Sequence, residues 1–244
     1  MLILNTRAAP LDDVNVRRAY SLAIDREALK SGVMEGIGQA AYGFSPEDIG
    51  HSGIVRTQKY DPAEANRILE AAGWRMGGSS FREKDGRRLA FKIGTYSGRA
   101  ELEQFAVVIK DQVKAVGIDL EIEKFPDVET ALAQNSFQST TYSIGSAAYG
   151  DLSQLLATLY VPSARNTDRY DNPAVTALYQ DYVATNDAAR KAAALKEMQE
   201  LIGEDVPVVY LYNPYQIVGA ATSVKSYAPH PLERDKVTPD MEVS

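Results

Sequence analysis

The chain has 244 residues, of which 45% are hydrophobic and 24% are charged, and its formal net charge at pH 7 is -7. These values are those of an ordinary globular protein, and an acidic balance without a basic block argues against a nucleic-acid partner. No apolar run approaches the ~20 residues that a membrane-spanning helix needs. The absence of cysteine excludes disulfides, thiolate metal sites and cysteine nucleophiles.

The amino terminus lacks the pattern of a secretory signal. Met1 leads directly into Leu2-Ile3-Leu4, which is typical of a buried strand, and the charged segment, apolar segment and cleavage site of a signal peptide are all missing. Two interpretations follow: the protein is cytoplasmic, or its N-terminal part is missing from this chain.

Helices and strands alternate along most of the chain. The helix from Asp61 has the clearest ends, because an Asp-Pro-Ala-Glu start is followed by a stop at Gly73. In chain order the sequence predicts a strand at 2–4, a helix after 13 that ends in the stretch 32–43, a helix at 61–73, a hairpin turn at 83–86, a strand at 89–96, a helix at 99–116, a strand at 118–124, a helix at 128–134, a strand at 141–146, helices at 152–159, 173–184 and 188–202, and strands at 206–212 and 216–220. Segment 89–124 is a strand-helix-strand unit with parallel strands, and the whole pattern predicts an α/β layered fold.

Little of the sequence resembles enzyme chemistry. His51 and His230 lie in predicted loops without metal-ligand spacing, and no serine elbow or phosphate-binding glycine loop is present. The carboxylate pairs Glu121/Glu123 and Glu204/Asp205 are interpreted as surface charges or the end of a helix. The chain is therefore predicted not to be an enzyme, with no catalytic residue, cofactor or metal ion.

Two features favour ligand binding. From Thr141 to Asp151 the chain passes from a strand through small residues to a helix start, and such a stretch leaves room for a ligand beside backbone donors. A tight strand–helix turn explains the same residues equally well. The chain also has 14 tyrosines and one tryptophan; amphipathic rings suit a cleft, although core packing accounts for most of them.

A series of short motifs extends from about residue 4 to about residue 230. They are Leu4-Asn5-Thr6, Pro10-Leu11-Asp12-Asp13, Val16-Arg17-Arg18-Ala19, Ala23-Ile24-Asp25-Arg26, Tyr60-Asp61-Pro62-Ala63-Glu64-Ala65, Leu69-Glu70-Ala71-Ala72-Gly73-Trp74, Gln112-Val113-Lys114, Val116-Gly117-Ile118, Ala148-Tyr149-Gly150-Asp151, Tyr170-Asp171-Asn172-Pro173 and Val206-Pro207-Val208-Val209. In this order and spacing they resemble the extracellular solute-binding proteins of family 5, the peptide, nickel and opine class that serves ABC importers.

The resemblance implies a lobe of the periplasmic-binding-protein type (type II), with a layered mixed sheet flanked by helices. Family members are about twice as long and begin with a signal peptide and an N-terminal lobe, so this chain is expected to be the C-terminal lobe only, a domain fragment. Residues 1–209 then form the ligand-binding lobe, and residues 210–244 are expected to return toward the N-terminal lobe. Since capture needs two lobes that close about a hinge, the chain alone should bind weakly or not at all.

The function implied is capture of an oligopeptide or dipeptide-like solute, and its delivery to ABC permease subunits by a monomer that is periplasmic or extracellular. Peptide-binding relatives often carry an acidic residue where this chain has Ala148, and Asp151 replaces it only if the turn points it inward. The ligand-binding residues expected from the resemblance are Tyr142, Gly145, Ser146, Ala148, Tyr149, Asp151 and Arg7.

Three alternatives stay open. The first is a nickel, metal-chelate or opine ligand, which the ending Pro229-His230-Pro231-Leu232-Glu233 favours, whereas Ser153 and Gln154 stand where nickel-binding relatives can offer a histidine. The second is a cytoplasmic α/β enzyme. The third is a binding module that signals through a partner instead of feeding a transporter.

Overall fold

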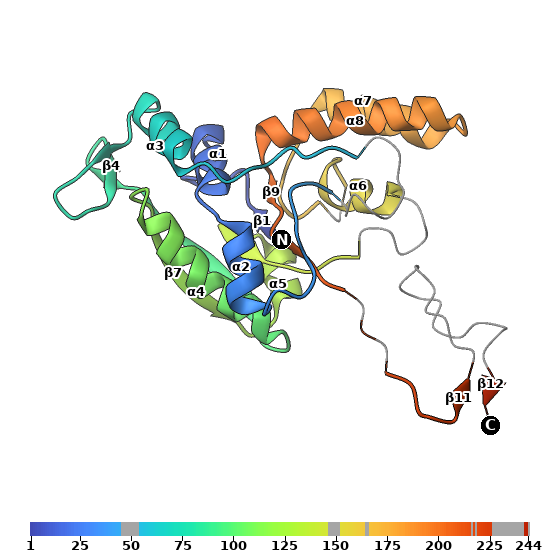
Figure 1. Ribbon diagram of the computed structural model, residues 1–244. Coiled ribbons are helices and arrows are strands. Elements are labelled where there is room, and N and C mark those ends of the chain that lie inside the picture. Colours follow the sequence, from blue (N-terminus) through green and yellow to red (C-terminus); the bar gives the residue numbers. More distant parts are fainter. Residues whose placement is uncertain are drawn as a thin grey trace.

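The computed structural model (Figure 1) describes residues 1–44, 54–145, 152–163, 166–215, 217, 219–225 and 242–243. Its helices are α1 (Val14–Leu22), α2 (Arg26–Val33), α3 (Pro62–Ala71), α4 (Ala100–Lys114), α5 (Val128–Gln134), α6 (Ser153–Leu159), α7 (Pro173–Ala184) and α8 (Ala188–Asp205). Its strands are β1 (Leu2–Leu4), β2 (Gln39–Ala40), β3 (Arg75–Met76), β4 (Arg82–Lys84), β5 (Arg87–Arg88), β6 (Ala90–Tyr96), β7 (Asp119–Phe125), β8 (Ser139–Thr141), β9 (Val208–Val209), β10 (Tyr212–Asn213), β11 (Val224–Lys225) and β12 (Glu242–Val243). Within these residues, no helix is both long and apolar enough to cross a membrane.

A five-stranded mixed sheet forms the centre, in the order β7-β6-β8-β1-β9. β6 is parallel to β7 from Ala90 opposite Asp119 to Tyr96 opposite Phe125, which confirms the predicted strand-helix-strand unit. β6 is also parallel to β8, whereas β1 runs antiparallel to both β8 and β9. The predicted α/β fold with a layered mixed sheet is confirmed.

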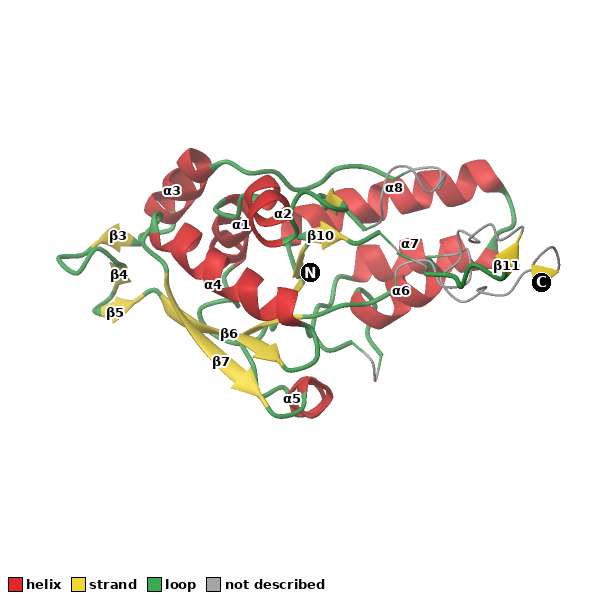
Figure 2. Ribbon diagram, turned by 60° about the horizontal axis from the view of Figure 1, so that its bottom comes forward, coloured by secondary structure: helices red, strands yellow, loops and turns green. Residues whose placement is uncertain are grey.

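Helices cover both faces of this sheet. Leu2 and Leu4 of β1 point into a core shared with α1, α2, α3 and α4, whereas Ile3 between them points into a second core shared with α5, α6, α7 and α8. Alternate side chains of a strand point to opposite faces, so one short strand contributes to both cores. Figure 2 shows α1 to α4 on one side of β6 and β7 and α5 on the other.

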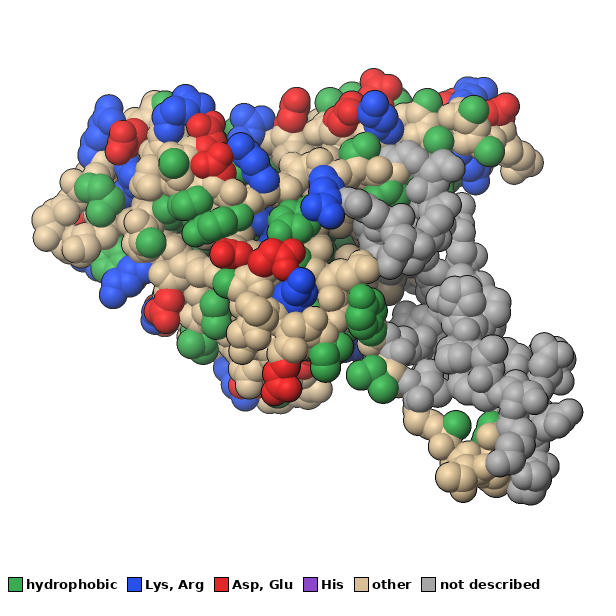
Figure 3. Space-filling model, in the orientation of Figure 1, with side chains coloured by type: hydrophobic (Ala, Val, Ile, Leu, Met, Phe, Trp, Pro, Cys, Tyr) green, Lys and Arg blue, Asp and Glu red, His purple; other side chains and the backbone are tan. Residues whose placement is uncertain are grey.

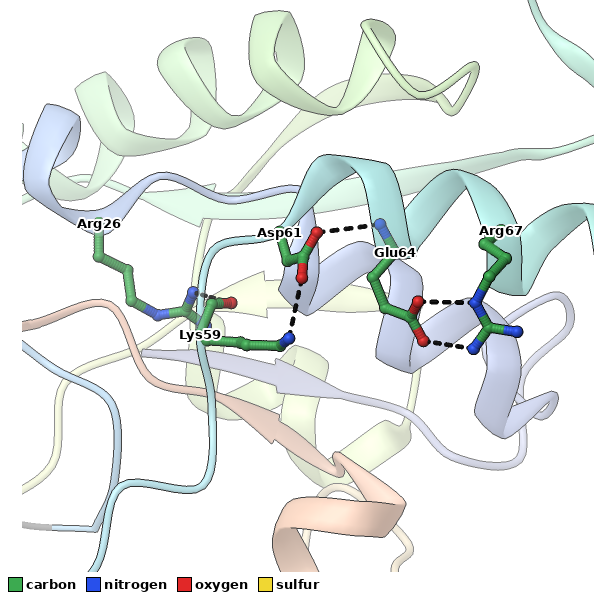
Figure 4. A network of polar contacts seen from close by, with 5 residues as sticks. All are labelled: Arg26, Lys59, Asp61, Glu64 and Arg67. Atoms are coloured by element: carbon green, nitrogen blue, oxygen red, sulfur yellow. Dashed lines mark hydrogen bonds and ion pairs between the residues drawn. The ribbon is translucent and has the colours of Figure 1, made fainter.

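The start of α3 shows how local sequence sets a helix end (Figure 4). The Asp61 carboxylate accepts from the Glu64 backbone N–H at 3.0 Å and also receives Lys59 Nζ at 2.8 Å. Glu64 in turn forms a two-pronged ion pair with Arg67 at 2.6 and 2.7 Å. The predicted cap is therefore confirmed, and the carboxylates in the first turn also favour the helix electrostatically.

Arg26 is fully buried, yet none of its hydrogen-bond acceptors is a carboxylate. It donates to Tyr210 O at 2.6 Å and to Gln58 Oε1 at 2.8 Å. Gln58 also accepts from the Tyr210 N–H and donates to Val208 O. The remaining acceptors of Arg26 are Ser21 O, Ser21 Oγ, Ile24 O and Lys59 O. Arg26 and Gln58 thereby fix the backbone around β9 to the start of α2 and to the chain that precedes α3.

Arg82 is the second fully buried arginine side chain among the described residues. It donates to Val116 O at 2.8 Å, to Trp74 O at 2.7 Å and to Asn66 Oδ1 at 2.6 Å. These bonds hold the small sheet β3-β4-β5 against α3 and the end of α4. The predicted turn at 83–86 joins β4 to β5, with Asp85 and Gly86 both at positive φ.

Several predicted boundaries were wrong. The single helix expected after residue 13 is two helices, because α1 ends at Leu22 and Asp25 starts α2 by accepting from the Ala28 N–H. The strand expected at 141–146 lies at 139–141, and the segment 206–212 is divided between β9 and β10, after Val206 in left-handed conformation. Among the described residues of 216–220, none is in a strand.

The carboxylate of Asp205 also differs from its interpretation as a surface charge. It lies in the last turn of α8 and accepts from the Tyr170 hydroxyl at 2.7 Å and from Asn172 Nδ2 at 3.0 Å. Arg17 Nε donates to the backbone oxygen of Asp205. The motif at 170–173 thus joins the loop before α7 to the end of α8.

Candidate functional site

The carboxyl ends of four strands meet at one edge of the central sheet. β6, β7 and β8 are parallel, and β9 has the direction of β8 because both pair antiparallel with β1. β1 therefore begins where the other four end, and Met1 exchanges two backbone hydrogen bonds with Tyr142, at 3.0 and 3.1 Å. We call the residues that follow these strand ends, 96–98, 126–129, 142–145 and 211–213, the carboxyl edge. In open α/β sheets ligands bind outside such ends, so this edge is the candidate site.

Three polar side chains come together there from three different segments. Tyr96 ends β6, Glu129 lies in the first turn of α5 after β7, and Tyr142 follows β8. The Tyr142 hydroxyl donates to Glu129 Oε1 at 2.8 Å. Both tyrosines are half-buried and Glu129 is exposed. The Glu129 carboxylate, which the Tyr142 hydroxyl orients, therefore faces solvent between the strand ends at Tyr96 and Tyr142.

The electrostatics of these side chains agree with their geometry. Burial, followed by the hydrogen bond to Glu129 and its negative charge, raises the pKa of the Tyr142 phenol well above its usual value. Burial also raises the pKa of Tyr96, where Arg99 opposes the shift and Glu129 adds to it. Both phenols therefore stay protonated at neutral pH and can donate hydrogen bonds.

Of the ligand-binding residues expected from the sequence, Tyr142 and Gly145 lie together at the carboxyl edge, Gly145 being exposed. Ser146, Ala148, Tyr149 and Asp151 lie outside the described residues. Tyr96 and Glu129 were not among the expected residues. Tyr96 is the last residue of a predicted strand, which is a partial signal, whereas Glu129 lies inside a predicted helix and had none.

Arg7 is not brought together with the others. It follows the carboxyl end of the antiparallel strand β1, where the Asn5 N–H donates to Gln138 O, just before β8 begins. Its own backbone N–H donates to Asn5 Oδ1 at 3.2 Å, and its side chain is exposed. Arg7 therefore lies at the opposite edge of the sheet from Tyr142 and Gly145.

A cavity of about 630 Å³ also lies away from the carboxyl edge. It is bounded on one side by the chain from Ala9 to Asp13 and on the other by the β4–β5 turn, with Trp74 beside it. Cationic and anionic side chains line it in equal number, and the Trp74 indole nitrogen is fully covered without a hydrogen-bond partner. Because that donor cannot be reached from the cavity, we do not place the functional site there.

Within the described residues, no group of three or more His, Cys, Asp or Glu side chains is placed to hold a metal ion. Carboxylates at or near the carboxyl edge instead cap a helix or form an ion pair. Asp127 caps α5 by accepting from the Thr130 N–H, and Glu101 lies 3.6 Å from Arg99. The arrangement suits recognition of a small polar solute by hydrogen bonds, charge and ring contacts.

Comparison with known families assigns the chain. A model of bacterial extracellular solute-binding proteins, family 5 (middle), matches residues 1–167. The chain belongs to this family. It is 30% identical over 203 residues to protein XP55 of Streptomyces lividans, covering 82% of this chain and 37% of that protein. It is 26% identical over 227 residues to the oligopeptide-binding protein AppA of Bacillus subtilis, covering 90% of this chain and 42% of that protein.

Among solved structures, a nickel ABC transporter protein from Bacillus halodurans has a TM-score of 0.82 at 27% identity, covering 99% of this chain and 51% of that one. This family-5 chain thus spans about two fifths of the length of the curated relatives and half of the solved one. The family consists of binding proteins, in line with the prediction that the chain is not an enzyme.

Proposed function

We propose that the chain is one lobe, the C-terminal half, of the substrate-binding component of an ABC importer, and that its carboxyl edge forms one wall of the solute site. The observation that carries this proposal is the gathering of four strand ends at that edge. The chain also leaves the sheet there after β9. In this proposal a second lobe faces the same edge, and a solute between the lobes contacts both.

In this proposal residues 1–209 form the lobe and residues 210–244 contact the second lobe. Figure 1 shows the chain running outward from β9, away from the sheet, to β11 and β12. Tyr215 and Ile217 on this stretch are 57% and 81% exposed. Apolar side chains this exposed are suited to a surface that another part of the protein covers.

The solute we propose is an oligopeptide or dipeptide-like molecule, held by Tyr142, Gly145, Ser146, Ala148, Tyr149 and Asp151. A peptide carries amide donors and acceptors along its length, which the hydroxyls and backbone groups of the edge match. The likeness to the oligopeptide-binding protein AppA supports this class.

A metal chelate is the second candidate, supported by the 27% identity to a nickel ABC transporter protein. In this second proposal the metal is bound together with its own chelator. In both cases the partners are membrane permease subunits, the protein acts as a monomer, and its place is the periplasm or the cell exterior.

The test is ligand capture. We expect mass spectrometry of the two-lobed protein, purified without refolding, to detect one class of bound solute. Isothermal titration with that solute should then give a dissociation constant in the micromolar range or lower. Residues 1–244 alone should bind it at least about a hundredfold more weakly, since half of the contacts are missing. Tight binding by residues 1–244 alone contradicts the two-lobe proposal.

A further inference from the structure

The outer side of β9 presents main-chain groups that no described strand covers, because β9 is the last strand of the central sheet. The Leu4 N–H donates to Pro207 O, so Pro207 faces β1. Successive residues of a strand face opposite sides, and the C=O of Val208 and the N–H of Tyr210 therefore point away from β1. Both residues are buried, and buried main-chain groups need hydrogen-bond partners.

The side-chain amide of Gln58 supplies these partners. Its Oε1 accepts from the Tyr210 N–H at 3.0 Å, and its Nε2 donates to Val208 O at 2.7 Å. Arg26 Nη2 donates to the same Oε1 at 2.8 Å, which orients the amide. The backbone of Gln58 is held as well, because its N–H donates to Tyr42 O at 3.2 Å. Gln58 thus takes the place that a further strand would have along this stretch of β9.

The residue that Gln58 holds lies where the chain changes from one sheet to another. The pairing with β1 ends at Val209, and the pairing with β2 begins at Tyr212. Between them, Tyr210 has its N–H on Gln58 and its C=O on Arg26 Nε, at 2.6 Å. Two side chains, and not a ladder of strands, therefore set the direction of the backbone at Tyr210.

We propose that Gln58, oriented by Arg26, is a positioning residue that fixes the path by which the chain leaves the central sheet. The inference rests on the proposed function, in which residues 210–244 contact the second lobe, and it adds that this segment starts from a fixed point at Tyr210. Loss of the Gln58 amide frees the exit of the chain, and the second lobe then loses its defined position relative to the carboxyl edge.

The first test is amide hydrogen exchange in the 244-residue chain. Gln58→Leu keeps most of the side-chain volume but removes the hydrogen bonds of the amide, so the Tyr210 N–H should exchange at least about tenfold faster. The Ile93 N–H in β6 should accelerate less, because the opening is local. Gln112→Leu is the matched control, since Gln112 also bonds a main-chain N–H and C=O, those of Asp25, and it should leave Tyr210 unchanged.

The second test measures the direction of the exit by pulsed electron spin resonance between two spin labels. The chain has no cysteine, so the labels attach only at the introduced pair Tyr215→Cys and Val107→Cys, both at exposed positions. We expect a narrow distance distribution in the labelled chain and in its Gln112→Leu variant, and a broad one with Gln58→Leu. Gln58→Glu, which can still accept from the Tyr210 N–H, should keep the distribution narrow.

Several outcomes overturn this role of Gln58. They are a distribution that is broad before any change at Gln58, one that stays narrow in Gln58→Leu, one that Gln58→Glu or Gln112→Leu broadens equally, and Tyr210 exchange that does not exceed that of Ile93 in its acceleration. If Gln58→Leu does not fold, Gln58→Asn replaces it, because its shorter side chain cannot span the same groups. The proposed function fails separately, if the two-lobed protein captures no solute although the exit stays fixed.

Discussion

Arg26 and Glu129 are both charged side chains close to where the chain enters and leaves the central sheet, but their surroundings are opposite. Arg26 is fully buried and donates six hydrogen bonds, all to neutral oxygens. Burial lowers its pKa to about 10, which still leaves it charged at neutral pH. Glu129 is exposed and accepts a single hydrogen bond from another side chain.

This difference separates a charge held inside the fold from one that solvent and solutes can reach. Removing a charge from water is costly, so a buried one persists only where every donor finds an acceptor, and a ligand cannot reach it. An exposed carboxylate with free acceptor sites keeps both its hydration and its capacity to bind. Figure 3 shows exposed acidic and basic side chains spread over the surface, so exposure alone does not mark a site.

The largest effect is expected for Arg26→Ala. The change leaves Tyr210 O and Ile24 O without their donor, and the free energy of unfolding should fall by about 3 kcal/mol or more. Urea denaturation measures the loss. Arg67→Ala, which removes only an exposed ion pair with Glu64, should leave the midpoint unchanged within error. Equal losses of unfolding free energy in Arg26→Ala and Arg67→Ala would contradict the distinction between buried and exposed charges.

Arg82→Ala should follow with a loss of about 2 kcal/mol, because three oriented hydrogen bonds disappear from a covered site. Amide hydrogen exchange should accelerate chiefly in β3, β4 and β5, which these bonds attach to α3 and α4. Arg87→Ala, exposed on β5, is the control. Faster exchange confined to another part of the molecule would contradict this role.

Asp168 is a buried carboxyl group without a full set of hydrogen-bond partners. Its Oδ1 accepts from the Tyr170 N–H at 3.0 Å, its Oδ2 has no partner among the described atoms, and burial raises its pKa well above the usual value. As pH rises through the ordinary aspartate range, the unfolded chain ionises first, so stability should fall with pH.

Asp168→Asn removes this dependence. The variant should therefore gain stability over the parent protein from about pH 4 toward pH 7, and the difference should vanish in stronger acid, where both forms are neutral. Denaturation midpoints across this range provide the measurement, with the exposed Asp171→Asn as control. A constant difference at every pH would show that the pKa of Asp168 is the same in the folded and unfolded chain, contrary to this prediction.

The smallest effect on stability is expected for Tyr142→Phe. Only the hydrogen bond to an exposed carboxylate is lost, so the free energy of unfolding should change by less than about 1 kcal/mol. Thermal unfolding checks this value, with Glu129→Gln as the companion variant. A loss as large as that of Arg82→Ala would make the carboxyl edge part of the structural framework.

Much of the fold could be predicted from the sequence because its signals are local. Asp61 and Gly73, or the turn at Asp85 and Gly86, define their elements within a few residues. β8 was placed too late because its residues are polar: Ser139, Thr140 and Thr141 are buried, and the hydroxyls of both threonines donate to Gly94 O. A buried strand of hydroxyl residues shows no alternation of polar and apolar side chains.

The candidate site was harder to predict, because it depends on contacts between distant segments. Tyr142 was expected from the resemblance and was placed inside a strand at 141–146, whereas it lies just after β8. Glu129 becomes its partner only because β7 and β8 lie on either side of β6, which no local pattern encodes. Arg7 was expected with these residues, and the antiparallel direction of β1 places it at the far edge of the sheet.

The place of β1 has a consequence for how the chain folds. Leu2 pairs with Thr141 on one side and with Val209 on the other, so this strand waits for segments that are made much later. The β6–α4–β7 unit, by contrast, finds its partners within residues 90–125. Because contacts between distant segments form late, we expect this unit to assemble first. Until β8 is made, the apolar residues Leu2, Ile3 and Leu4 stay uncovered, and it is during synthesis that the chain most needs protection from aggregation.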